Sequence, residues 1–156
     1  MKKILIIVLS LFLSSTLMAA GSDSSSGSSS SMGDTLYEDA VKLVKRAGKL
    51  EKKDKTDKAK KLYAQAFNKL EKAYKSDKKN PDILNYMGFT SRKVGNFDQA
   101  EKFYLKGLNI KPNHNGINEY LGELYVQTNR IDKANERLEV LKSCNCKEYG
   151  ELELII

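Results

Sequence analysis

The feature that most constrains the fold is a 34-residue repeat in the second half of the chain. Placing residues 81–114 over residues 115–148 brings matching side chains together at regular intervals. Identical pairs include Ile83/Ile117, Gly88/Gly122, Asp98/Asp132 and Ala100/Ala134, and similar pairs are Met87/Leu121, Phe97/Ile131 and Tyr104/Leu138. A further shift of 34 residues places Tyr63, Ala66, Leu70 and Ala73 on Phe97, Ala100, Tyr104 and Gly107. This self-similarity predicts a stack of equivalent supersecondary units.

The local signals indicate that each unit is a pair of helices joined by a short turn. Asn80-Pro81-Asp82 is typical of a helix start, with a capping side chain, proline in the first turn and an acid at the positive helix end. Gly95 aligns with Asn129, and both residue types tolerate the left-handed backbone of a tight turn. Small residues at Gly88 and Gly122 would let the paired helices approach closely. We therefore expect an all-α chain of antiparallel hairpins.

These residues resemble the tetratricopeptide repeat. Leu121-Gly122-x-x-Tyr125, followed by Ala134 and Leu138, is similar to the Leu-Gly-x2-Tyr…Ala-x3-Phe pattern of that family. The preceding unit matches the pattern at Met87-Gly88, Ala100, Tyr104 and Pro112, although the usual tryptophan is missing from the chain. The resemblance implies a short right-handed α-solenoid of about three units: repeat 1 at about 35–80, repeat 2 at 81–114 and repeat 3 at 115–148.

The first repeat departs from the others in length. Its first helix is amphipathic, with apolar residues spaced by threes and fours at Leu36, Ala40, Leu43, Ala47 and Leu50. If Ala47 takes the part of Gly88, then 19 residues separate it from Ala66, against 12 in the later repeats. Seven extra residues are about two helical turns. We therefore expect a divergent first hairpin that extends beyond the others.

After repeat 3, residues 149–156 are expected to close the array. Tyr149, Leu152, Ile155 and Ile156 recur at helical spacing and predict a short capping helix of the kind that repeat proteins require. Pairing of this segment with a second copy of the chain is the alternative, and the oligomeric state stays open.

The N-terminal residues predict export from the cytoplasm. Lys2 and Lys3 precede an apolar run, and small residues follow it, as in a cleaved signal peptide, which we place at 1–21. The run is too short for a bilayer-spanning helix, although an uncleaved anchor is the alternative. Residues 22–33 are almost all serine and glycine and are expected to be a disordered linker, or a wall-contacting segment. Folding should then begin near Asp34, with residues 34–156 forming the domain of a periplasmic or secreted bacterial protein.

The resemblance implies a binding surface and no enzyme. In such repeats the first helices of successive units line a concave face, where we place the groove residues Asn85, Phe89, Arg92, Lys93, Glu119, Glu123 and Gln127. The chain shows no nucleophile elbow, phosphate loop or paired metal motif, and His114 is its only histidine, so no cofactor or metal is expected. The leading hypothesis is a non-catalytic adaptor in a periplasm that holds a protein or peptide segment.

Two alternatives rest on other residues. From Lys42 to Lys79 there are 15 Lys or Arg residues against 5 Asp or Glu, so this hairpin could bind an anionic envelope polymer. Nucleic acid is not expected as a partner of an exported protein. Cys144-x-Cys146 is expected to form a local disulfide in an oxidising compartment, with intermolecular bridging, free thiols, redox exchange or Cu(I) binding as alternatives.

Overall fold

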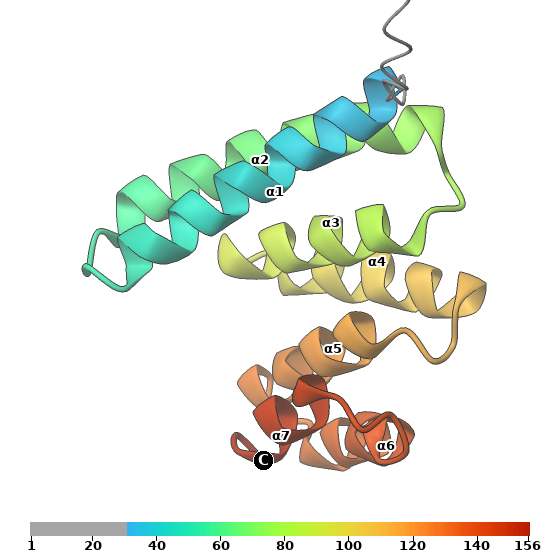
Figure 1. Cartoon of the computed structure of the whole chain (residues 1–156). Coiled ribbons are helices and arrows are strands. Elements are labelled where there is room, and N and C mark those ends of the chain that lie inside the picture. Colours follow the sequence, from blue (N-terminus) through green and yellow to red (C-terminus); the bar gives the residue numbers. More distant parts are fainter. Residues whose placement is uncertain (1–30) are drawn as a thin grey trace, which may run out of the picture.

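A computed structural model describes residues 31–156, which form a curved stack of antiparallel helical hairpins (Figure 1). The expected signal peptide and most of the expected linker lie outside the described residues. Within residues 31–156 there are seven helices and no strand. They are α1 (Met32–Glu51), α2 (Thr56–Ser76), α3 (Pro81–Lys93), α4 (Phe97–Ile110), α5 (Asn115–Gln127), α6 (Ile131–Leu141) and α7 (Lys147–Glu153). The all-α solenoid expected from the repeat is confirmed.

The fold begins slightly earlier than the expected boundary at Asp34. Ser31 caps α1: the Asp34 backbone N–H donates to Ser31 Oγ at 3.2 Å, and the Ser31 backbone N–H donates to the Asp34 carboxylate at 2.9 Å. This reciprocal capping box satisfies donors that a helix start otherwise leaves free. Gly33 is buried against Ser76, and a methyl group added there would lie 3.2 Å from Ser76 Cβ. Met32 and Gly33 therefore belong to the domain and not to the linker.

The turns inside the three hairpins share one backbone feature. Each contains a residue of positive φ: Asp54 at 55°, Gly95 at 91° and Asn129 at 56°. Glycine and asparagine adopt this conformation at low cost, which explains why those residue types recur at the aligned positions. The expected turns at Gly95 and Asn129 are confirmed, and Asp54 marks the turn of the first hairpin.

Small residues set the spacing between helices where the repeat places them. A methyl group added at Gly88 would lie 2.4 Å from the buried ring of Tyr104, which packs across α3. A methyl group added at Gly107 would lie 2.4 Å from Ile117 Cδ1 in the next hairpin. Bulky side chains therefore fill the space that each glycine leaves, both within a repeat and between repeats.

The first hairpin is longer than the second. Helix α1 has 20 residues against 13 in α3, and α2 has 21 against 14 in α4, so each helix gains about two turns. Ala47, Ala59 and Ala66 are all fully buried between these two long helices. Figure 1 shows the turn between α1 and α2 extending beyond the ends of α3 and α4.

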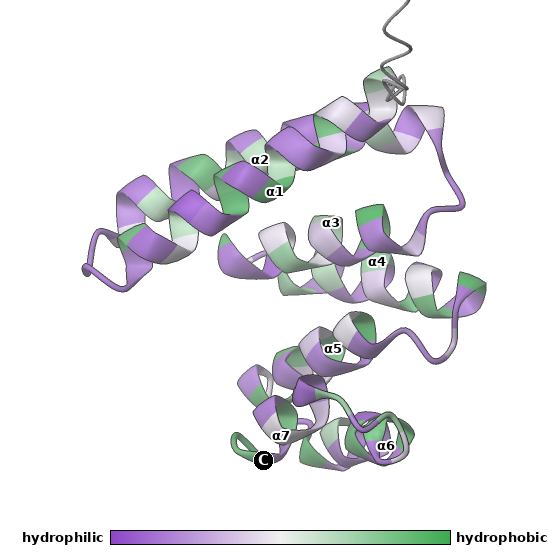
Figure 2. Cartoon of the chain, viewed as in Figure 1, coloured by the Kyte–Doolittle hydropathy of each residue, from purple (hydrophilic) through white to green (hydrophobic). Residues whose placement is uncertain are grey.

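Helix α7 closes the other end of the stack, as expected, but with different boundaries. It spans Lys147–Glu153, and Leu152 is its fully buried residue, packed over Gly122. Ile155 and Ile156 lie beyond the helix and are 45% and 40% exposed, so they are not part of the buried cap. Figure 2 shows this hydrophobic tail next to α7, at the opposite end of the stack from the largely hydrophilic first hairpin.

Most of the buried apolar residues form two clusters. One combines residues of α1, α2 and the start of α3, including Tyr63, Leu70 and Ile83. The other combines residues of α4, α5 and α6, including Tyr104 and Leu121. The boundary between the clusters therefore passes through the second hairpin.

Candidate functional site

A hollow of about 490 Å³ opens where the first helices of the three hairpins lie side by side, next to the start of α7. It is lined mainly by residues from the N-terminal ends of α3, α5 and α7, together with Tyr37 of α1. The lining residues are Tyr37, Asp82, Asn85, Tyr86, Lys111, Asn113, His114, Asn115, Gly116, Glu119, Tyr120, Lys147 and Glu148. Aromatic, acidic, basic and amide groups therefore meet in one place.

Three tyrosines form aromatic walls of the hollow. The rings of Tyr37 and Tyr86 meet edge to face, with centroids 5.7 Å apart, and Tyr120 stacks at a tilt on Phe89 at 4.9 Å. Burial raises the pKa of Tyr37 and of Tyr120 above that of free tyrosine, so both keep their hydroxyl proton and can donate or accept a hydrogen bond. Such rings offer an apolar face and a polar edge to a ligand.

His114 shapes one rim of the hollow as the cap of α5. The Ile117 backbone N–H donates to its Nδ1 at 3.2 Å, so Nε2 carries the proton and donates to Asp82 Oδ1 at 3.0 Å. His114 therefore caps α5 with its side chain, and the residue is buried, since only 8% of it is exposed.

Asn85 is the one groove residue with an unused buried acceptor in the hollow. The residue is 6% exposed, and its Oδ1 has no hydrogen-bond donor within the described chain. Gly116 stands opposite: a methyl group there would lie 3.0 Å from Asn85 Nδ2. An unsatisfied buried amide oxygen costs about 1–3 kcal/mol. A rotation of the Asn85 amide toward the hollow would offer this oxygen to a hydrogen-bond donor of a ligand and recover that energy.

Glu119 lies deeper, beside Glu151 of α7. Burial, and then the interaction with Glu151, raise the pKa of Glu119 well above that of free glutamate, while Glu119 and Lys147 lower the pKa of Glu151. Lys147 Nζ lies 3.1 Å from Glu151 Oε2. Glu119 therefore holds its proton at neutral pH, next to the ionised Glu151 of α7.

The other predicted groove residues mostly contact one another. Arg92 is 5% exposed, its guanidinium lies 2.6 Å from Glu123 Oε2, and it stacks between the rings of Phe89 and Tyr120 at 5.6 and 5.8 Å. This cation joins α3 to α5 and is not free to meet a partner.

The last two predicted groove residues lie toward the C-terminal ends of their helices. Lys93 Nζ lies 2.8 Å from Glu51 Oε2 and above the ring of Tyr63. Gln127 is exposed at the end of α5. Of the seven predicted groove residues, only Asn85 and Glu119 line the hollow.

The tyrosine walls and the contribution of α7 to the hollow were not predicted from the sequence. One signal was present, because Tyr86 and Tyr120 are an identical pair at the 34-residue spacing. Nothing in the periodicity placed Lys147 and Glu148 at the hollow, since they belong to the segment that departs from the repeat.

Cys144 and Cys146 are joined in a disulfide between α6 and α7. This is the local pairing expected among the alternatives, and it restricts the path by which α7 returns to the stack. Within residues 31–156, no group of three His, Cys, Asp or Glu side chains is arranged to hold a metal ion. Over the same residues, no helix is long and apolar enough to cross a bilayer.

Comparison with known proteins supports the fold alone. No protein-family model and no curated protein matches the sequence. Among solved structures, the chain is similar to PcrH in complex with the chaperone binding region of PopB, at 14% identity and a TM-score of 0.52, over 76% of this chain and 95% of that one. The chain has the tetratricopeptide-type fold.

Two further solved structures share the arrangement more loosely. The first TPR of Spaghetti (RPAP3) bound to the HSP90 peptide SRMEEVD is 20% identical, with a TM-score of 0.49 over 76% of this chain and 94% of that one. The Yersinia enterocolitica translocator chaperone SycD is 16% identical, with a TM-score of 0.47 over 76% and 92%. At these levels they carry no argument about the site.

Proposed function

We propose that this chain is a non-catalytic module that binds a segment of another protein in the hollow between α1, α3, α5 and α7. The observation that carries the proposal is the buried, unpartnered Oδ1 of Asn85 beside tyrosine walls. A peptide backbone N–H or a side-chain donor is the group that this acceptor lacks. The tyrosine rings would cover the apolar part of the same segment.

The fold supports this proposal by the surface it creates. Helical repeats stack their first helices into an extended face, on which a peptide can contact several repeats at once. PcrH, with a similar fold, is described in complex with a segment of PopB. The hollow holds no nucleophile and base in the arrangement that acyl or phosphoryl transfer needs, so binding is the chemistry that its residues favour.

We place this module in the bacterial periplasm or outside the cell. The charged and apolar N-terminal sequence supports export. The Cys144–Cys146 disulfide also supports an oxidising compartment. In the disulfide form neither sulfur is a thiolate, which argues against Cu(I) handling as the function.

The test is a binding measurement on a matched pair of variants. A synthetic peptide, selected against the full chain from a displayed random library, is titrated by calorimetry into the wild type, Asn85→Ala and Asn109→Ala. Asn109 is an exposed asparagine on α4 and is not among the residues that line the hollow. Loss of one buried hydrogen bond should weaken binding about threefold to tenfold in Asn85→Ala and leave Asn109→Ala unchanged.

Two results would argue against the proposal. One is equal affinity of both variants for every selected peptide. The other is a set of peptide-induced amide shifts, measured by NMR, that avoids Tyr86, Gly116 and Tyr120. Thermal unfolding of each variant, followed by circular dichroism, separates lost binding from lost folding.

A further inference from the structure

The free end of the first hairpin carries an unusual concentration of positive charge. We call residues 45–61 the lysine tip: nine of its seventeen residues are Lys or Arg, and three are Asp or Glu. The nine cations are Lys45, Arg46, Lys49, Lys52, Lys53, Lys55, Lys58, Lys60 and Lys61. Every one of them is exposed.

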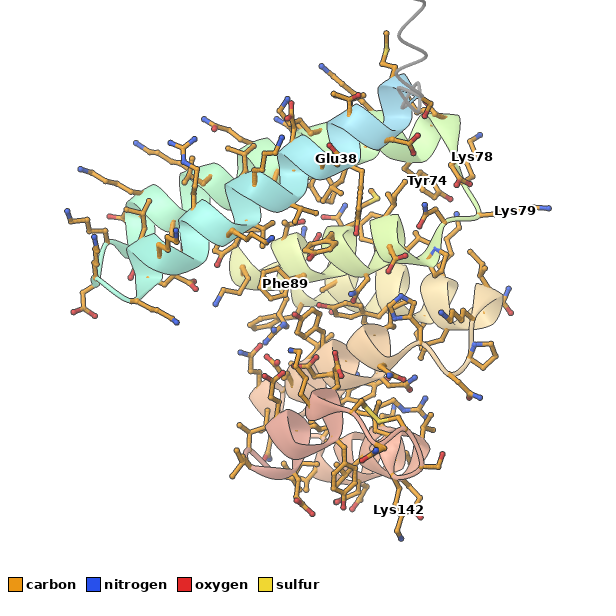
Figure 3. The ribbon with its side chains drawn as sticks, in the orientation of Figure 1. Glu38, Tyr74, Lys78, Lys79, Phe89 and Lys142 are labelled. Carbon is orange, nitrogen blue, oxygen red and sulfur yellow. A yellow bond between two sulfur atoms is a disulfide. The ribbon has the colours of Figure 1, made fainter. Side chains whose placement is uncertain are left out.

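The fold carries this charge away from the rest of the molecule. The seven extra residues in each of α1 and α2 add about 10 Å of helix, at 1.5 Å per residue. Figure 1 shows that the added length lies at the turn end, beyond α3 and α4. Nitrogen-ended side chains spread around that end in Figure 3, and no residue of the lysine tip lines the hollow.

The charge of the lysine tip is not neutralised from within. In the part of the chain that the structure describes, none of its nine cations has a carboxylate oxygen within 4.0 Å. The acid at the end of α1, Glu51, is already engaged by Lys93 at 2.8 Å and by the hydroxyl of Tyr63 at 3.0 Å. Asp54 and Asp57 are the remaining acids of the tip, and both are exposed.

The composition of the lysine tip narrows the class of partner. It contains no aromatic residue on which a base could stack, and only one arginine for two-pronged phosphate contacts. Its alanines, Ala47 and Ala59, are fully buried, and Leu50 is half-buried, so no apolar side chain is available to enter a bilayer. Lysine side chains are flexible and carry a compact charge. They therefore suit a polymer that has an anionic group on each unit and no fixed conformation.

We infer that the lysine tip binds a flexible anionic polymer other than nucleic acid, such as a polyuronate or a polyphosphate. The cations lie on the outward faces of both helices and in the turn between them, so a flexible chain can contact more of them than a flat surface can. Binding displaces the counterions of the polymer, and the affinity therefore falls steeply as salt rises. This inference concerns a different surface from the peptide-binding hollow and does not depend on it.

The experiment compares two variants of the full chain that lose equal charge. In the tip variant, Lys49, Lys53, Lys58 and Lys61 are all replaced by glutamine. In the control variant, Lys72, Lys75, Lys78 and Lys79 are replaced by glutamine; all four are exposed, and Figure 3 shows Lys78 and Lys79 at the opposite end of the same hairpin. Lysine and glutamine have similar helix propensities, so folding should be preserved in both.

Binding of fluorescent alginate and of long-chain polyphosphate is measured by anisotropy between about 50 and 200 mM salt. The tip variant should bind whichever polymer the wild type prefers about tenfold more weakly or worse, with a shallower salt dependence, because four fewer counterions are displaced. The control variant should stay close to the wild type. Alginate and polyphosphate are separate arms, so the result also says whether carboxylates or phosphates are preferred.

Three outcomes would overturn the inference. The two variants could lose affinity equally, which would mean that net charge and not the tip decides binding. An oligothymidylate of about 20 nucleotides, or vesicles containing phosphatidylglycerol, could bind more tightly than both polymers through the tip. The third outcome is that neither polymer binds the wild type even at the lowest salt concentration. Peptide binding in the hollow should be unchanged in both variants, so the two proposals fail independently.

Discussion

Replacing Gly88 with alanine tests the packing on which the repeat depends. The added methyl carbon would lie 2.4, 2.6 and 2.8 Å from three ring carbons of Tyr104, where about 3.5–4.0 Å is normal for carbon contacts. Tyr104 is fully buried, so its ring cannot move aside without shifting α3 from α4. Overpacking of this kind costs about 3 kcal/mol, at the upper end of the usual range, and the better helix propensity of alanine returns about 1 kcal/mol.

We therefore expect Gly88→Ala to reduce the free energy of unfolding by about 2 kcal/mol. For a domain of this size that lowers the Tm by roughly 5–10 °C, measured by circular dichroism at 222 nm. Gly48→Ala is the matched control, because its methyl group would meet only Tyr63 Oη at 4.0 Å, an ordinary contact. There the propensity effect acts alone and should raise the unfolding free energy by about 1 kcal/mol. A Gly88→Ala protein as stable as the wild type would refute the close packing of α3 on Tyr104.

Three further predictions concern α7 and its neighbours. Leu152→Ala should lower the free energy of unfolding by about 2–5 kcal/mol in chemical denaturation, because the side chain is fully buried. Leu154 is 86% exposed, so Leu154→Ala should change the free energy of unfolding by less than about 0.5 kcal/mol. Similar losses in the two variants would show that α7 is not a cap. Because the pKa of Glu119 is raised in the folded state, its contribution to stability is complete below the ordinary glutamate pKa near 4.3 and is lost as the pH rises through the raised value. Glu119→Gln should therefore flatten the rise in Tm from pH 8 to pH 5. An unchanged profile would contradict a protonated Glu119 in the folded state. Replacing Cys144 and Cys146 with serine should lower the free energy of unfolding by about 1.6 kcal/mol, the loop-closure entropy of so short a ring. The expected readout is a modest drop in Tm, equal to that caused by a reductant. A much larger loss would show that the disulfide stabilises more than this local loop.

The repeat and its turns could be predicted from the sequence because they depend on local requirements. A left-handed turn selects Gly95 and Asn129, and a close approach between helices selects Gly88, whichever residues surround them. The partner of Gly122 could not be predicted in the same way. Leu138 takes the aligned place of Tyr104, and the space over Gly122 is filled instead by Leu152 of α7. That substitution depends on how the last helix returns to the stack, which the repeat does not encode.

The candidate site was harder to predict because pairing among charged residues is a property of the folded molecule. Periodicity placed Arg92 and Glu123 on the same face, but it could not indicate that they would bind each other at 2.6 Å and leave little charge for a partner. It also could not indicate that Glu119 would be covered by α7. The repeat alone places Asn85 on the first helix of its unit, and the structure has this residue in the lining of the hollow.

The division of the buried residues into two clusters has a consequence for how the chain can be shortened. Helices α3 and α4 belong to one repeat, yet α3 completes the cluster of α1 and α2 while α4 completes that of α5 and α6. Cutting at a repeat boundary, after residue 80, would expose Ile83 and Met87 to water. The boundaries of the repeats and the boundaries of the buried clusters therefore do not coincide in this chain. The smallest fragment that keeps either cluster intact includes one helix of the middle hairpin.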